Sequence, residues 1–214
     1  MQPSLSRKFY TITALLSFVI ICNACSQSTE TKYFKDVTTT HLPIDAKAHA
    51  LDVVLADVNG DGHLDAILAL EKQPNRLYLN DGTGKFTWKK SVFAEKSHDT
   101  EHVRVADLDN DGKLDVIFVA EDDHHHEYYL GNGDGTFENV SERLLAKSEA
   151  NGLDIGDVNG DGLIDVIIGN SGSTKQNFLW LNDPEKPGHF TDYTKLGLPA
   201  IDQETQSVKL ADLN

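Results

Sequence analysis

A nine-residue segment rich in aspartate recurs along the chain and carries the residues best suited to chemistry. Residues 57–65 read DVNGDGHLD, residues 107–115 read DLDNDGKLD, residues 157–165 read DVNGDGLID, and a further copy begins as DLN at 212–214. The first three copies start fifty residues apart, and the fourth starts fifty-five residues after the third. Such spacing indicates an internal structural repeat.

Comparison of the copies shows what each position must supply. Positions 1, 3, 5 and 9 are always Asp or Asn, whereas position 7 is His63, Lys113 or Leu163, which share only a backbone carbonyl. Carboxylates at alternate positions, one main-chain oxygen and a closing carboxylate suit a hard cation, and so many carboxylates repel one another without a counter-charge. Oxygen-only ligands on a flexible loop favour Ca²⁺ over Mg²⁺ or Zn²⁺.

The backbone requirements of the segment are also visible. Position 6 is glycine in all three complete copies, where the chain must turn sharply, and we expect a positive φ angle there. Position 4 is Gly60, Asn110 or Gly160, and both residue types tolerate the left-handed region. A plain hairpin turn would not need an oxygen-bearing side chain at four fixed positions in three copies, so metal binding is the favoured interpretation.

An EF-hand is excluded by the residues that come after each loop. An EF-hand needs a bidentate Glu at position 12 and flanking helices, but position 12 is Leu68, Phe118 or Ile168. A β-branched and aliphatic run, such as residues 66–70, leaves each loop and predicts a buried strand.

Composition narrows the class of protein. The 214 residues allow one domain or two and contain enough apolar side chains for a core. The formal net charge is −15, with 34 acidic residues against 19 Lys and Arg. Phosphate recognition depends on Lys and Arg, so a nucleic-acid partner is not expected.

Residues 1–25 have the pattern of a targeting segment. Arg7 and Lys8 precede an apolar run over residues 10–21, which is too short for the ~20 residues of a membrane-spanning helix. The ending CNACS resembles a bacterial lipobox, with Cys25 as the lipidated residue, although Cys22 stands where Leu is typical. After processing, no thiol would remain for a disulfide. Bound metal ions are therefore the expected stabilising cross-links.

The residues around the first loop outline a complete structural unit. Strands are expected at 49–55, 66–70, 76–79 and 86–89, with a hairpin turn at 80–84 before the last strand. The other two units show the same order. Four short antiparallel strands repeated every ~40–50 residues predict the blades of an all-β β-propeller.

A second phrase, of the form Phe-x-Asp-Val-Thr, recurs in the fourth strands. It occurs at residues 137–141 and 190–194, in degraded form at 86–88, and also at 34–38, where no loop precedes it. We expect residues 34–38 to form a lone fourth strand, which either closes a ring against the last blade or is an ordinary edge strand. Three blades and the start of a fourth cannot close a ring, so the sequence is expected to be part of a longer protein.

The loop with its following strand, the Asn-x-Leu-Tyr-Leu-Asn-like third strand and the Phe-x-Asp-Val-Thr-like fourth strand resemble FG-GAP/VCBS repeats, found in integrin α-subunit-type propellers and many secreted bacterial proteins. The resemblance covers residues 33–214, after a signal peptide at 1–25 and a tether at 26–32. It implies Ca²⁺ bound between the first and second strands of each blade, with position 7 contributing its backbone oxygen. The ligands so implied are Asp57, Asn59, Asp61, His63, Asp65, Asp107, Asp109, Asp111, Lys113, Asp115, Asp157, Asn159, Asp161, Leu163 and Asp165, with Asp212 and Asn214 beginning a fourth set.

Three other segments attract functional interpretations that we do not favour. Residues 124–126 are three consecutive histidines, which cannot all converge on one ion, so a solvated loop is predicted. The glycine-rich residues 131–135 lead into a strand and lack the helix N-terminus that holds phosphate, so a hairpin is predicted. Residues 141–150 are expected to form a short capped helix that links two blades.

The function implied by the resemblance is binding rather than catalysis. The strand aromatics Tyr128, Tyr129, Phe178 and Trp180 are expected in the core, and no nucleophile–base pair is visible. We favour a calcium-binding, non-catalytic propeller, secreted across the inner membrane and displayed on the bacterial outer membrane or cell surface. It would touch the membrane only through a lipid on Cys25 and would bind a protein or glycan. The alternatives are a scaffold for a polysaccharide-active enzyme whose catalytic part follows Asn214, and a purely architectural lipoprotein.

Overall fold

The computed structural model describes residues 34–43 and 48–213. The chain divides into two compact units, residues 1–36 and 37–214, and the strands found among the described residues all belong to the second. The predicted targeting segment 1–25, the tether 26–32, the lipidation site Cys25 and the last candidate ligand Asn214 lie outside the described residues. No helix in the described part of the chain has the length and apolar character needed to cross a membrane.

The first blade is a four-stranded antiparallel sheet whose strands follow one another in sequence order. Register pairs include Val54 with Ile67, and Tyr78 with Trp88. Its strands are β1 (Ala50–Ala56), β2 (Asp65–Gln73), β3 (Arg76–Asn80) and β4 (Phe86–Lys89).

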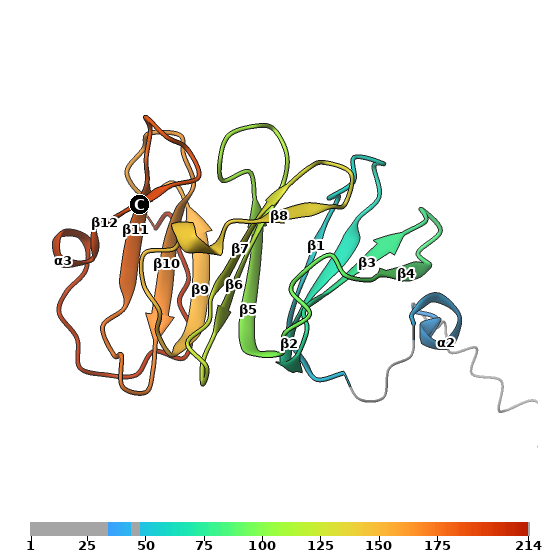
Figure 1. Cartoon of the computed structure of the whole chain (residues 1–214), viewed down its shortest axis with the longest axis horizontal. Helices are drawn as coiled ribbons and strands as arrows, with labels where there is room; N and C mark the ends of the chain where they lie inside the picture. The colour runs from blue at the N-terminus through green and yellow to red at the C-terminus, as the bar shows by residue number, and fades with distance from the viewer. Residues whose placement is uncertain (1–33, 44–47, 214) are drawn as a thin grey trace, which may run out of the picture. The chain divides into compact units, whose positions relative to one another are not determined.

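The second and third blades repeat this order (Figure 1). The second contains β5 (His98–Ala106), β6 (Asp115–Ala120), β7 (Glu127–Gly131) and β8 (Phe137–Asn139). The third contains β9 (Ala150–Gly156), β10 (Asp165–Asn170), β11 (Phe178–Asn182) and β12 (Phe190–Asp192). The predicted propeller architecture is therefore confirmed, with element ends shifted by a few residues.

The first two blades are also joined through their edges. The end of β2 pairs with the start of β5, where Glu71 lies opposite Asp99 and Gln73 opposite His98. The hydrogen-bonded sheet thus runs through eight strands, while the third blade forms a separate sheet of four. The sequence predicted separate blades and contained no sign of this connection.

The core lies between the blades. One apolar cluster, with Ile67, Phe93, Val103 and Phe118, fills the space between the first and second blades. Another cluster, with Ile117, Leu153 and Trp180, fills the space between the second and third blades. The strands β6 and β10 are buried along their whole length because both faces of a blade need apolar cover.

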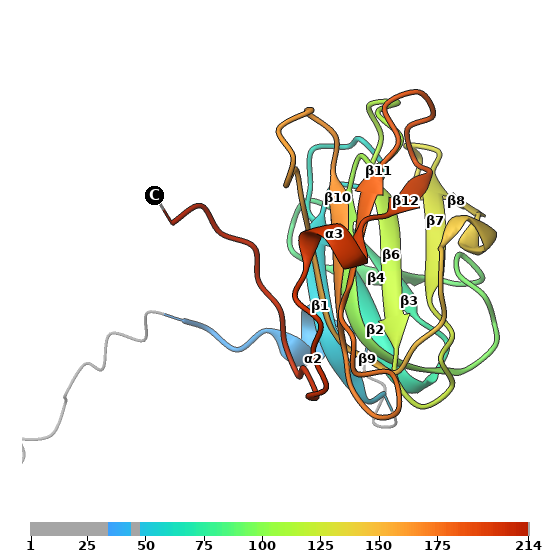
Figure 2. The same cartoon turned by 90° about the vertical axis from the view of Figure 1, so that its left-hand side faces the viewer.

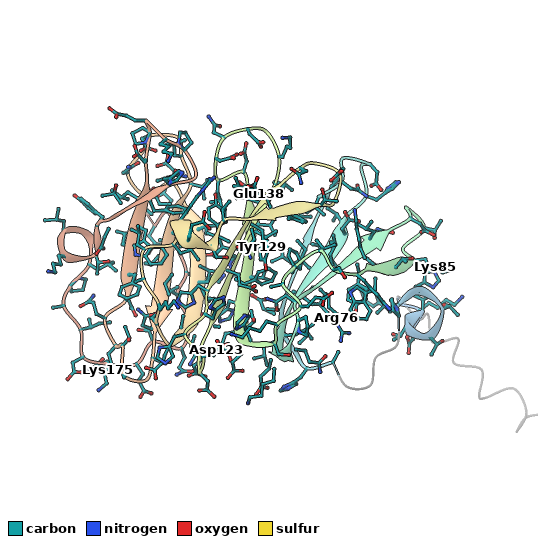
Figure 3. All side chains as sticks on the ribbon, viewed as in Figure 1. Arg76, Lys85, Asp123, Tyr129, Glu138 and Lys175 are labelled. Atoms are coloured by element: carbon teal, nitrogen blue, oxygen red, sulfur yellow. The ribbon has the colours of Figure 1, made fainter. Side chains whose placement is uncertain are left out.

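The aromatic residues of the strands belong to this core, as predicted. Tyr128, Tyr129 and Trp180 are at most 2% exposed, and Phe178 packs against the cluster between the second and third blades. Figure 3 shows Tyr129 within the molecule, whereas Lys85 and Lys175 project at its edges.

The free face of the first blade remains partly uncovered. Leu51, Val53 and Leu55 on β1 are 42–56% exposed. They line an apolar hollow together with Leu42 and Phe86.

The prediction of a strand at residues 34–38 is wrong. Residues 34–37 form no strand, Phe34 is 91% exposed, and a short helix, α2 (Thr38–His41), begins at Thr38. A strand requires a partner edge, and no described strand pairs with this segment. In the second and third blades the same phrase pairs with β7 or β11 and then turns into a 3₁₀ helix, η1 (Ser141–Arg143), or into α3 (Thr194–Gly197).

The predicted capped helix at residues 141–150 is much shorter than expected. Only η1 is helical, and no side chain caps its N-terminus. The Ser141 hydroxyl bonds instead to Asn139 Oδ1 (2.8 Å), which fixes the exit from β8. The segment still links the second blade to the third.

The residues after α3 return to the third blade. Leu210 N donates to Asp154 Oδ2 (2.8 Å), and Thr205 N donates to the carbonyl of Asn170 (2.8 Å). Residues 205–210 thus lie against β9 and β10, immediately before the fourth copy of the Asp-rich segment. Figure 2 shows the chain leaving the sheets beyond this contact.

Candidate cation-binding loops

The three complete Asp-rich segments connect the first strand of each blade to the second. They join β1 to β2, β5 to β6 and β9 to β10, and they lie at the same end of the three blades (Figure 1). These are the connections in which the family resemblance places the candidate ligands. The repeated spacing reflects three equivalent loops on one face of the protein.

The loop backbone has the conformation that its glycines predicted. At position 6, φ is +85° for Gly62 and Gly112 and +87° for Gly162. At position 4, Asn110 has φ of +60°, and the glycines of the other copies are also positive. Two left-handed residues in one short loop turn peptide N–H groups of the loop toward the position-1 carboxylate.

The position-1 carboxylates accept these N–H groups. In the first loop Gly60 N donates to Asp57 Oδ1 and Gly62 N to Asp57 Oδ2, both at 2.8 Å. Asp157 accepts the equivalent pair in the third loop at 2.7 and 2.9 Å. Hydrogen bonds from the loop lower the pKa of both carboxyls, against a smaller opposing effect of burial in Asp157. At Asp57 burial is the largest single influence and raises the pKa, but the combined hydrogen bonds outweigh it.

The position-9 carboxylates are held differently, in full burial. Asp65, Asp115 and Asp165 are each 0% exposed. Asp115 Oδ2 accepts from Leu108 N (2.8 Å) within the loop, and its Oδ1 accepts from Gly131 N (2.9 Å) on β7. The other two blades have the same bond to the third strand. This residue therefore ties the loop to the sheet.

Burial has a clear electrostatic effect at position 9. It raises the pKa of Asp115 to about 6, against the lowering effect of the hydrogen bonds from Gly131 and Leu108. Burial likewise raises the pKa of Asp65 and Asp165. A buried carboxylate with raised pKa is stabilised in its ionised form by a nearby positive charge.

The second loop brings three carboxylates together. One oxygen from each of Asp107, Asp109 and Asp115 lies within 4.8 Å of the others. The pKa of Asp109 is raised, first by burial and then by the negative charge of Asp111. Carboxylates at this spacing repel one another unless a cation or a proton lies among them.

The second loop also contains a lysine side chain beside one of its candidate ligands. Lys113 Nζ contacts Asp111 Oδ2 at 2.7 Å, at the surface of the loop. This hydrogen bond is the main cause of the lowered pKa of Asp111. The ammonium group would have to move if Asp111 bound a metal ion through that oxygen.

The first and third loops replace one carboxylate by an amide. Asn59 Oδ1 accepts from Asp61 N (3.0 Å), and Asn59 Nδ2 donates to Asp61 Oδ2 (2.9 Å). Asn159 and Asp161 have the same geometry. Both loops thus present only oxygen ligands and place them in the same order as the second loop.

The donor chemistry fits a hard divalent cation. Each loop offers carboxylate or amide oxygens at positions 1, 3, 5 and 9, and no nitrogen or sulfur ligand is needed to complete the set. In the incomplete fourth copy, Asp212 is exposed and Asn214 lies outside the described residues.

Two functional features were missed or misinterpreted from sequence. Residues 124–126 form a loop, as predicted, but the prediction that it is solvated is wrong, because His126 is 5% exposed and bonds through its ring to Ser148 and Ala120 N. Burial lowers the pKa of His126 to about 4. His125 stacks on His98, a residue far away in sequence that no local pattern singled out.

A row of charges across the first strands of the blades was also missed. Arg104 on β5 contacts Asp52 on β1 and Asp154 on β9. The signal was available in principle, since Asp52, His102 and Asp154 stand about one repeat apart. That spacing predicts a contact only once the first strands of successive blades are known to lie side by side.

Four-stranded antiparallel blades with an Asp-rich loop at each first bend define a β-propeller repeat protein. The sequence model of the FG-GAP-like repeat family matches residues 57–118, 117–168 and 157–214, and the chain belongs to that family.

Similarity to curated proteins is weaker. The chain is 27% identical over 161 residues to "Cartilage acidic protein 1" of Xenopus tropicalis, a match that covers 67% of this chain and 24% of that protein. It is 28% identical over 144 residues to the protein of the same name from Homo sapiens, covering 62% of this chain and 22% of the relative. The chain therefore spans less than a quarter of the length of these relatives.

Proposed function

We propose that the chain is a calcium-binding, non-catalytic propeller segment in which each complete Asp-rich loop binds one Ca²⁺ ion. The observation that carries the proposal is the convergence of Asp107, Asp109 and Asp115 in the second loop. The first and third loops share its backbone geometry and oxygen-only ligands. Oxygen ligands at this spacing on a tight loop are the set that Ca²⁺ prefers.

The bound ion would act chiefly on stability. The position-9 carboxylate bonds to both the loop and the third strand, so a cation beside it would fasten the bend between the first two strands to the rest of the blade. Extracellular calcium modules have dissociation constants on the order of 10⁻⁴–10⁻³ M. At roughly 10 mM free Ca²⁺, each such loop would stabilise the folded state by about 1.4–2.7 kcal/mol.

Isothermal titration with Ca²⁺ tests the stoichiometry. We expect binding to each of the three complete loops, and loss of one of these events in each of Asp61→Ala, Asp111→Ala and Asp161→Ala. Glu138→Ala, an exposed acidic residue outside the loops, is the matched control and should bind as the wild type does. If all three loop variants retain wild-type stoichiometry, the loops are not the sites.

The wider role proposed is attachment to a bacterial cell envelope and binding of a protein or glycan there. Its support is the pattern of residues 1–25, which resembles a lipoprotein signal ending at Cys25. Mass spectrometry of protein expressed in a bacterial host should show a lipid on Cys25 that Cys25→Ser abolishes. Recovery of unlipidated wild-type protein from the membrane fraction would contradict this anchor.

A further inference from the structure

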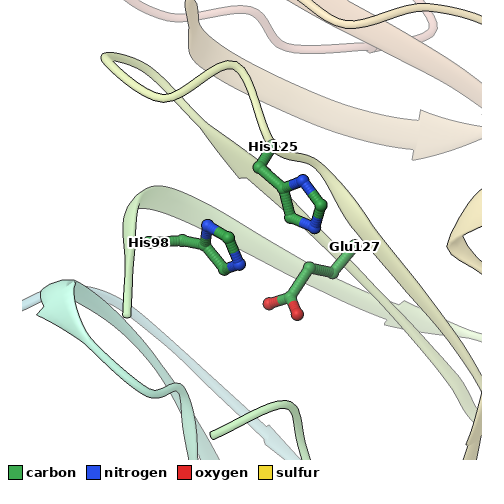
Figure 4. Close-up of side chains that lie close together, drawn as sticks. All are labelled: His98, His125 and Glu127. Carbon is green, nitrogen blue, oxygen red and sulfur yellow. The ribbon is translucent and has the colours of Figure 1, made fainter. Parts of the chain in front are cut away.

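A second cluster of potential ligands lies away from the Asp-rich loops. One ligand atom each from His98, His125 and Glu127 lies within 4.8 Å of the others. His98 begins β5, where that strand pairs with β2 of the first blade, while Glu127 begins β7 and His125 lies two residues before it. Figure 4 shows both imidazole rings beside the Glu127 carboxylate.

Only part of the histidine run takes part in this cluster. His125 and Glu127 are two residues apart and both lie beside His98 (Figure 4), whereas the His126 ring bonds to Ser148, which in turn bonds to Asn170 on β10. Three consecutive histidines cannot bind one ion, as expected from the sequence. Two alternate positions and a third residue from another strand can.

The cluster is built into the protein interior. His98 is 3% exposed and Glu127 is 2% exposed, while His125 is half-buried and stacks on His98 with ring centroids 4.1 Å apart. Glu127 is fixed by Tyr129 Oη (2.7 Å) and by Asn75 Nδ2 (3.0 Å) from the first blade. Each of its carboxylate oxygens retains a further lone pair for another partner.

A second carboxylate orients His98. Asp123 Oδ2 contacts His98 Nδ1, which leaves Nε2 as the nitrogen available to a ligand. A carboxylate bonded to the far nitrogen of an imidazole is the usual second shell of a metal-binding histidine, because it fixes the tautomer and raises ligand basicity. Two neutral imidazoles and two carboxylates would also balance a divalent charge.

We propose that His98, His125 and Glu127 form a binding site for a borderline divalent metal ion, Zn²⁺ being the natural occupant, with Asp123 as the residue that positions His98. Two nitrogens and one carboxylate oxygen are a zinc ligand set, with a fourth position left for water. Zinc ligands stand roughly 3.3 Å apart around the ion, so the cluster must contract slightly. The half-buried His125 side chain can supply this movement by rotating away from its stacked position on the His98 ring.

The site differs from the Asp-rich loops in chemistry and in location. Its nitrogen ligands do not suit Ca²⁺, and the Asn75–Glu127 bond places it at the contact between the first and second blades. A bound ion would therefore fasten those two blades together.

Cobalt substitution provides the test. The experiment uses the full chain with Cys22→Ser and Cys25→Ser, because a pair of thiols would bind the same metal, and it contains excess Ca²⁺ to occupy the Asp-rich loops. One equivalent of Co²⁺ should produce the intense visible absorption of a four- or five-coordinate site, and Zn²⁺ should displace it. His125→Ala should abolish the band, whereas the neighbouring His124→Ala should retain it.

Asp123 is tested through affinity rather than through loss of the band. Asp123→Asn should weaken Co²⁺ binding about 10–100-fold, and Asp123→Glu should restore much of it. Circular dichroism of the metal-free variants shows whether they fold. Absence of the band in the parent protein with Cys22→Ser and Cys25→Ser, or an unchanged band in folded His125→Ala, would overturn the proposal.

Discussion

Arg104 donates through Nη1 to Asp52 Oδ2 at 2.9 Å and so joins the first strand of one blade to the first strand of the next. Its Nε donates to Asp154 Oδ1 at 3.3 Å on the following blade. Asp52 also accepts from His102 and from Val103 N, and these bonds and Arg104 lower its pKa to about 2 although burial, the largest single influence, raises it. The three first strands are thus connected by charge as well as by the apolar contacts between blades.

Replacement of Arg104 should loosen this connection. Arg104→Met keeps most of the aliphatic stem but leaves the half-buried carboxylates of Asp52 and Asp154 without their guanidinium partner. Loss of a charged partner of this kind costs about 1–3 kcal/mol. Urea unfolding measures the change, and Lys85→Met, at an exposed position, is the control. An equal effect of the two substitutions would show that the bridge contributes nothing.

Gly131 should be intolerant of any side chain. A Cβ added there would lie 2.1 Å from the carbonyl oxygen of Leu114, a backbone atom that cannot move aside. Gly131→Ala would therefore displace β7 from the loop and weaken the Gly131–Asp115 hydrogen bond. Gly62→Ala is the comparison, because its Cβ meets nothing within 4 Å and it incurs only the cost of positive φ, about 1–2 kcal/mol. Thermal unfolding should show the larger loss for Gly131→Ala, and the reverse order would contradict this steric explanation.

Lys113 should limit the calcium affinity of the second loop. Its ammonium group competes for Asp111, and the third loop has Leu163 at the same position. Lys113→Leu should strengthen Ca²⁺ binding by up to about fivefold, the effect of a surface ion pair of roughly 1 kcal/mol. Titration in an Asp61→Ala, Asp161→Ala background isolates the second loop. Lys147→Leu, at an exposed position outside the loops, should leave the affinity unchanged.

Glu101 should make stability depend on pH. Burial, together with the negative charges of Glu121 and Asp99, raises its pKa to about 7. Between the ordinary carboxyl pKa and 7 the folded state binds more protons than the unfolded state, so stability falls as pH rises through this range. Glu101→Gln should match the wild type near a pH of about 4.5 and melt at a higher temperature at a pH of about 8. A wild type that melts higher than the variant under the alkaline condition would show that ionised Glu101 stabilises the fold.

The sequence predicts the blades well because each copy constrains the others. The Asp-rich loops, the aliphatic second strands and the turn before Phe86 recur, so their common features stand out from chance. Prediction fails where a residue's environment depends on the packing between blades. His98 and His125 are far apart in sequence, and only the folded second blade, in which β6 pairs with both β5 and β7, brings their rings together.

The lone segment at residues 34–38 shows a second limit. Its phrase matches those of two real fourth strands, yet it forms no strand in the described part of the chain. The phrase supplies side chains suited to the edge strand of a blade. Whether a strand forms depends on a neighbouring strand to pair with. Equivalent residues can therefore have different structures in one chain.

Differential scanning calorimetry with and without chelator tests the central claim, that cations in the Asp-rich loops hold the blades together. With Mg²⁺ kept constant, EGTA should lower the melting temperature of the wild type by about 8 °C or more relative to roughly 10 mM Ca²⁺, since the three loops together contribute about 4 kcal/mol at the least. The triple variant Asp61→Ala, Asp111→Ala, Asp161→Ala should melt near the chelated wild type and should not respond to Ca²⁺. An identical melting temperature for the wild type in EGTA and in Ca²⁺ would contradict the account.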